Sequence, residues 1–76
     1  MADASMYTSM FDDALLNIGQ VQAGSTDVLV AVFDAVGISI EAAALSQSIS
    51  ELGWSEERLL ASSDFAILTE RHFFSR

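Results

Sequence analysis

The chain has 76 residues, 51% of them apolar, no cysteine and a formal net charge of −8 at pH 7. That length allows one small domain, and without cysteine neither disulfides nor thiolate metal sites can reinforce its core. No Lys or Arg occurs before Arg58, and the remaining bases are Arg71 and Arg76. Because phosphate binding requires basic side chains on the contact face, this distribution excludes nucleic acid and anionic lipid as expected partners.

Charged residues make up only 18% of the chain, below the roughly 25% usual for soluble domains. A small domain with this apolar excess either has a tightly built core or hides apolar surface against a partner or a second copy, and we favour the partner. The longest apolar run, 28–33, is far shorter than the ~20 residues that span a bilayer. The first residues lack the pattern of a signal peptide. We therefore expect an intracellular, cytoplasmic protein without a membrane span.

The first half of the chain predicts two helices. Apolar residues recur at three- and four-residue steps from Met6 to Ile18, which predicts an amphipathic helix over about 5–20. After a turn, segment 27–36 is ambiguous, because its alternating valines favour a strand whereas its alanines and the following Gly37 favour a buried helix. We predict a helix there, since no second strand is evident for it to pair with.

The second half predicts three more helices. One covers about 39–52, with its first residue as the cap and Gly53 as a left-handed stop. A short helix over 56–61 follows, capped by Ser55 and carrying two acids in its first turn. The last helix covers about 64–74. The predicted fold class is all-α, a small bundle of four to five short helices in a single acidic domain.

The residues that carry chemistry form no pattern typical of an enzyme. His72 is the only histidine, so one chain cannot make a two-histidine site, and no nucleophile elbow accompanies the serines. The neighbouring acids Asp12 and Asp13 diverge by about 100° on a helix, so they do not converge as a catalytic pair. There is no calcium-loop spacing and no glycine-rich phosphate loop. We expect no enzymatic activity, no cofactor and no metal.

The aromatic residues are better placed for binding a protein. Aromatic side chains and arginine are common anchors of interfaces, and the last helix ends in an aromatic and basic run. Phe73 fits equally well as a residue that closes the core of the domain itself. Together with apolar residues of the first two helices, the predicted contact residues are Phe11, Leu15, Phe33, Arg71, Phe73 and Phe74.

Two segments of the chain resemble the N-terminal domain of the NudC (nuclear distribution C) family. They are Met10 to Gln20 (Met-Phe-Asp-Asp-Ala-Leu-Leu-Asn-Ile-Gly-Gln) and Asp27 to Phe33 (Asp-Val-Leu-Val-Ala-Val-Phe). The family domain has an aromatic-Asp-x-x-Leu-Leu run, an Ile-x-Gln step and a turn, followed by an Asp-aromatic-Leu-rich helix that ends in Phe. The family then has a basic-Thr-Asp-Phe-Phe motif. Its nearest equivalent here, 71–74, comes much later and lacks the Thr-Asp.

The resemblance implies a self-association or docking module, in a protein linked to dynein and chaperone function. The charged coiled coil and the β-sandwich of that family are not found in these residues, so only the docking role would carry over. We therefore expect a non-enzymatic protein–protein interaction module, as a homo-oligomer or as a subunit of a larger complex. The alternative is an acidic decoy or inhibitor that occupies a basic, nucleic-acid-binding site on its target.

Overall fold

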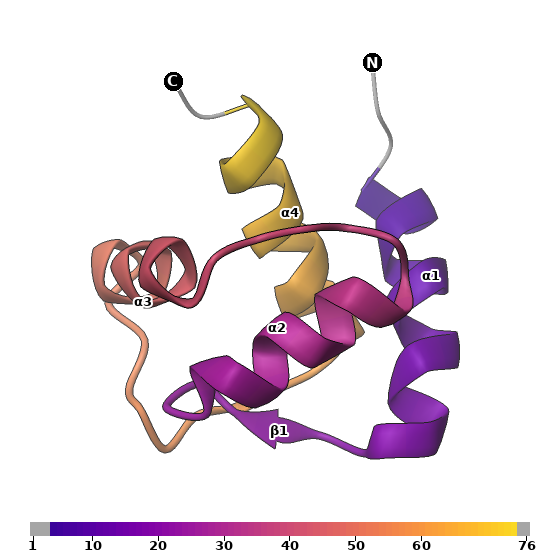
Figure 1. The fold of residues 1–76 in the computed structure, drawn as a ribbon, viewed down its shortest axis with the longest axis horizontal. Coiled ribbons are helices and arrows are strands. Elements are labelled where there is room, and N and C mark those ends of the chain that lie inside the picture. The colour runs from indigo at the N-terminus through magenta and orange to yellow at the C-terminus, as the bar shows by residue number, and fades with distance from the viewer. Residues whose placement is uncertain (1–3, 75–76) are drawn as a thin grey trace.

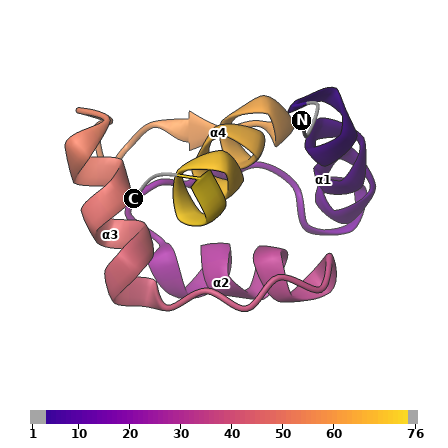
Figure 2. The same cartoon turned by 90° about the horizontal axis from the view of Figure 1, so that it is seen from above.

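The computed structural model describes residues 4–74, without the side chains of Ala4, Ser5 and Phe74. This part of the chain is all-α, as predicted, and forms four helices and one short ribbon (Figure 1). Helices α1 and α4 lie side by side and run in opposite directions. From above, α1 and α3 lie at the two ends, with α4 and α2 between them at two levels (Figure 2). The elements are α1 (Ala4–Ile18), β1 (Val21–Gln22), α2 (Thr26–Ala35), α3 (Ala42–Glu51), β2 (Leu59–Leu60) and α4 (Ser62–Phe74).

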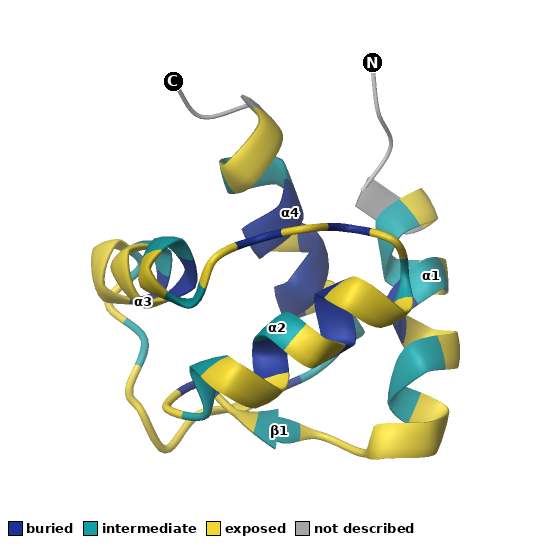
Figure 3. Ribbon diagram, viewed as in Figure 1, coloured by how far each residue is buried: buried dark blue, intermediate teal, exposed yellow. Residues whose placement is uncertain are grey.

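Three phenylalanines form the centre of the core. Phe11 of α1, Phe33 of α2 and Phe65 of α4 have no exposed surface. The ring centroid of Phe11 lies 5.0 Å from that of Phe65, in a stacked pair, and 5.2 Å from that of Phe33, edge to face. The Phe33 and Phe65 centroids lie 5.5 Å apart. Such pairs add about 0.5–1.5 kcal/mol each to the gain from burial, so the cluster fixes three helices relative to one another. Figure 3 shows the buried middle of α4 at this point.

Glycines end α2 and α3 where the sequence predicted. Gly37 has φ +83°, and its N–H donates to the carbonyl of Asp34 at 3.0 Å. The next residue, Ile38, donates to the carbonyl of Phe33 at 2.9 Å. These two bonds form a Schellman motif. Helix α3 ends in the same way at Gly53, with φ +74°. The prediction of a helix rather than a strand over 27–36 is confirmed.

Helix α3 begins later than predicted, because the residues before it are extended. Ser39 is not its cap; Glu41 holds the N-cap position, with extended backbone at φ −86° and ψ 147°. Ile38 and Ile40 are buried, whereas Ser39 between them is exposed. Residues two apart share one face only in an extended chain. Burial of both isoleucines therefore keeps this segment out of the helix.

The predicted helix over 56–61 is wrong. Segment 59–60 is strand β2, which pairs antiparallel with β1 in the register Val21 to Leu60. The pairing continues past the strands, because the N–H of Ala23 donates to the carbonyl of Arg58 at 2.9 Å. Isolated short helices are only marginally stable in water. Here Leu60 becomes fully buried and the backbone gains a partner strand, so tertiary pairing decides the conformation.

Candidate protein-interaction surface

Two of the predicted contact residues do not lie on the surface. Phe11 and Phe33 are 0% exposed and form the centre of the core, so the folded chain does not offer them to a partner. This corrects their assignment as interface residues. Both occupy the inward face of an amphipathic helix. Periodicity alone identifies an apolar face, but it does not tell whether the domain's own core or another protein covers that face.

The remaining predicted contact residues have different surroundings. Leu15 is partly buried against the core. The guanidinium of Arg71 donates to a carboxylate oxygen of Glu51 at 2.7 Å, so this arginine joins α4 to α3. Phe73 is 48% exposed, and its ring lies edge to face with His72, the centroids 4.9 Å apart. Phe73 therefore remains a candidate surface anchor, whereas the side chain of Phe74 lies outside the described residues.

Several large apolar side chains that the sequence analysis did not select are exposed. Leu16 of α1 is 83% exposed, which is the largest fraction among them. Its signal in the sequence was its position next to Leu15 but off the three- and four-residue steps of the inward face. The others are spread over all of the helices except α3, and over β2. They are Met6, Ile18, Val28, Leu59 and Ile67.

An open groove of about 460 Å³ lies between α1 and the end of α2. Met10, Ala14 and Ile18 contribute its apolar wall on α1, and Ala35 and Val36 contribute the opposite wall. The three α1 residues follow one another at steps of four. At 1.5 Å per residue, they line about 12 Å of the helix axis, or roughly two turns.

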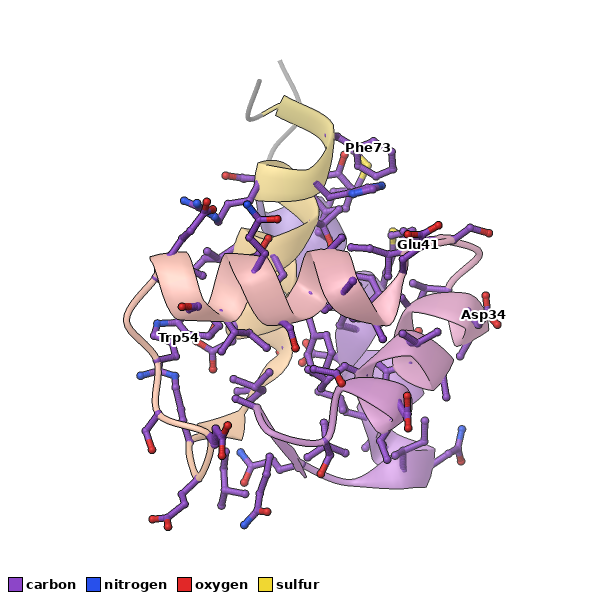
Figure 4. The ribbon with its side chains drawn as sticks, turned by 60° about the vertical axis from the view of Figure 1, so that its left-hand side comes forward. Asp34, Glu41, Trp54 and Phe73 are labelled. Carbon is purple, nitrogen blue, oxygen red and sulfur yellow. The ribbon has the colours of Figure 1, made fainter. Side chains whose placement is uncertain are left out.

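The rim of this groove is polar and acidic. Asp13 and Asn17 of α1 line it, and both are exposed. Asp34, the residue before Ala35, is exposed at the end of α2 but does not line the groove (Figure 4). From the sequence, Asp13 was expected only not to form a catalytic pair with Asp12. Its role in lining a groove depends on the position of α2, which no local pattern reveals.

The described surface has an excess of carboxylates without a cationic partner. Both described arginines are in ion pairs within the chain: Arg58 lies 2.9 Å from a carboxylate oxygen of Asp64, and Arg71 pairs with Glu51. No other arginine or lysine occurs between residues 4 and 74. Eight acids in this range therefore have no cation beside them from this part of the chain. They are Asp12, Asp13, Asp27, Asp34, Glu41, Glu56, Glu57 and Glu70.

Two other hollows in the described surface are less suited to binding a protein. One, of about 450 Å³, lies by the segment before α3 and is lined by Ile40, Glu41 and His72 among others. The hydroxyl side chain of Ser39 lines it as well, but Ser39 and His72 are both exposed to solvent. The other, of about 270 Å³, lies beside Trp54 and is lined mainly by small and hydroxyl side chains, with Glu56. Figure 4 shows Trp54 and Glu41 on opposite sides of the molecule.

The contacts around Trp54 hold the fold together. The guanidinium carbon of Arg58 lies 4.5 Å from the Trp54 ring centroid, and the same guanidinium pairs with Asp64. The second carboxylate oxygen of Asp64 accepts the N–H of Ala61 at 2.9 Å, which caps the first turn of α4 from inside the helix. Arg58 and Asp64 therefore hold the segment 53–61 against α4.

Within residues 4–74, no group of three or more His, Cys, Asp or Glu side chains gathers to hold a metal ion. None of the described helices combines the length and the apolar character needed to cross a membrane. Comparison of the chain with protein-family models, with curated proteins and with solved structures gives no match.

Proposed function

We propose that this protein is a non-enzymatic protein–protein interaction module, a docking subunit of a larger assembly. One observation carries the proposal. A domain of this size leaves Leu16, Met6, Leu59 and Phe73 each about half or more exposed, although its core is already closed around three phenylalanines. Single exposed apolar residues are normal on a protein surface, whereas a contiguous apolar surface is typical of a site that binds another protein. What supports docking is their number in so small a domain together with the mainly apolar groove between α1 and α2.

The acidic surface favours a heterologous partner over a second copy. With a net charge of −8, two copies repel each other at long range, whereas a basic partner is attracted and its association accelerated. The resemblance of 10–33 to the NudC docking domain supports the same kind of role. The segments that carry the resemblance contain Leu16, which is exposed in the structure, as well as residues of the core.

Affinity capture from the cells that make the chain, washed at low and at about 0.5 M salt, tests this function. A docking module keeps a stoichiometric partner at high salt, because apolar contacts are not screened. The variant Leu16→Glu or Leu59→Glu should release that partner, whereas Ser9→Glu, at another exposed position of α1, should retain it. Capture of no stoichiometric protein at either salt concentration, with a monomeric chain in sedimentation equilibrium, contradicts the proposal.

The acidic decoy is the second candidate, and the eight carboxylates without a cation favour it. A decoy binds through charge alone, so its partner should be a nucleic-acid-binding protein that leaves at about 0.5 M salt. Leu16→Glu should then strengthen capture slightly instead of abolishing it. Salt and this one variant thus distinguish the two functions.

A further inference from the structure

We propose that the groove between α1 and α2 binds a basic amphipathic helix of a partner protein. The inference rests on the proposed docking function. It adds to the exposed Leu16 and Leu59 a second contact site on a different face of α1, and it identifies the chemistry of the partner helix that fits this site. Five of the seven residues that line the groove are apolar: Met10, Ala14, Ile18, Ala35 and Val36. The groove is open and has a volume of about 460 Å³.

The shape of the groove suits a helix. It follows α1 for about 12 Å, which matches two turns of a partner helix with apolar anchors at i, i+3 or i+4, and i+7. The α1 side presents Met10, whose unbranched and polarizable side chain adapts to anchors of different shape. The α2 side presents Ala35, which is exposed and small, so it leaves the space open.

The charge of the partner follows from the rim. Asp13 lines the groove and is exposed, in a chain whose formal net charge is −8. No described arginine neutralises this carboxylate, because Arg58 and Arg71 are held by Asp64 and Glu51. Lysines or arginines flanking the apolar anchors of a partner helix would meet the carboxylate of Asp13. A second copy of this chain has no cation to offer from residues 4–57.

Binding is measured by fluorescence anisotropy with a labelled synthetic 18-residue peptide of leucine and lysine, whose leucines recur at three- and four-residue steps. A companion peptide carries glutamate in place of every lysine. We expect the lysine peptide to bind at least about tenfold more tightly than the glutamate peptide at 0.15 M salt. Equal binding of the two peptides overturns the charge assignment.

Two pairs of variants locate the site. Ala35→Trp fills the groove and should weaken binding at least about tenfold, whereas Ala43→Trp, at an exposed alanine of α3, should change it less than about twofold. Asp13→Lys should weaken binding about fivefold, and Asp12→Lys, which makes the same charge change one residue away and outside the groove, less than about twofold. Equal effects within either pair overturn the groove as the site.

A second measurement covers the case in which Ala35→Trp does not fold. Amide chemical shifts of the unmodified chain, titrated with the lysine peptide, should move most at Met10, Asn17 and Ala35. Shifts centred on α3 or on the Trp54 corner instead overturn the proposal. A salt-resistant partner found by capture, together with no peptide binding in the groove, leaves the docking function standing and removes only this site.

Discussion

Two parts of the molecule are held together by different means, one between helices far apart in sequence and the other within a short segment. At the centre, Phe11, Phe33 and Phe65 bring α1, α2 and α4 together through buried aromatic rings. At the corner after α3, the loop is fixed to α4 by Arg58 and Asp64, a charged pair beside an indole ring. The centre depends on area removed from water, whereas the corner depends on the directions of a few polar bonds.

This difference separates the residues that hold the core together from those that determine the charge of the surface. The three phenylalanines at the centre are fully buried, so they are not available to a partner. The corner pairs Arg58 with Asp64, and Arg71 pairs with Glu51, so neither described arginine is left to balance the other eight acids of the described chain. We expect substitutions in the two parts to differ in size and in their dependence on salt.

The largest expected effect is that of Phe65→Ala in the aromatic centre. Removing a fully buried ring costs about 3–5 kcal/mol, a large part of the ~5–15 kcal/mol that stabilises a typical domain. We expect the variant to be largely unfolded, or to unfold at a much lower urea concentration, as followed by circular dichroism. Ile67→Ala on the same helix, at a residue 41% exposed, is the control and should cost less than about 1 kcal/mol. Similar losses in both variants would contradict the central role of the ring cluster.

An intermediate effect is expected for Asp64→Ala at the corner. The substitution removes the acceptor for the N–H of Ala61 and the partner of Arg58, and loss of a helix cap costs about 0.5–2 kcal/mol. Asp64→Asn keeps an oxygen that can accept the Ala61 bond, so it should recover about half of the loss. Equal destabilisation in urea by Asp64→Ala and Asp64→Asn would assign the whole effect to the Arg58 pair.

The smallest effect is expected for Glu51→Ala. Its carboxylate pairs with Arg71 across solvent-exposed surface, with the Glu51 side chain 51% exposed. Exposed ion pairs contribute about 0.2–1 kcal/mol and are screened by salt. The stability difference from the unmodified chain should therefore nearly vanish in about 0.5 M salt. A difference that persists at high salt would show that Glu51 stabilises α3 by other contacts, such as that with Gln47.

The candidate surface was less accessible to sequence reasoning than the fold. Periodicity placed Phe11 and Phe33 on apolar faces correctly, but it assigned those faces to a partner when the core takes them. Leu16 lies off the inward stripe of α1 and was not predicted as a contact residue, although among the described residues it is the most exposed large apolar side chain. The groove joins α1 to the last residues of α2, so its lining becomes visible only when both helices are in place.

The sequence by itself determined the helices that have an apolar face of sufficient length and a glycine to end them. Helix α2 is the clearest case, because Gly37 supplies a left-handed residue that ends a helix whatever surrounds it. The tertiary structure decided the short segments. Residues 59–60 became a strand because β1 offered a backbone partner, and 38–41 stayed extended because two isoleucines had to enter the core. Short segments gain too little from local bonds to fix their own conformation, so the neighbours that they meet in the folded chain decide it.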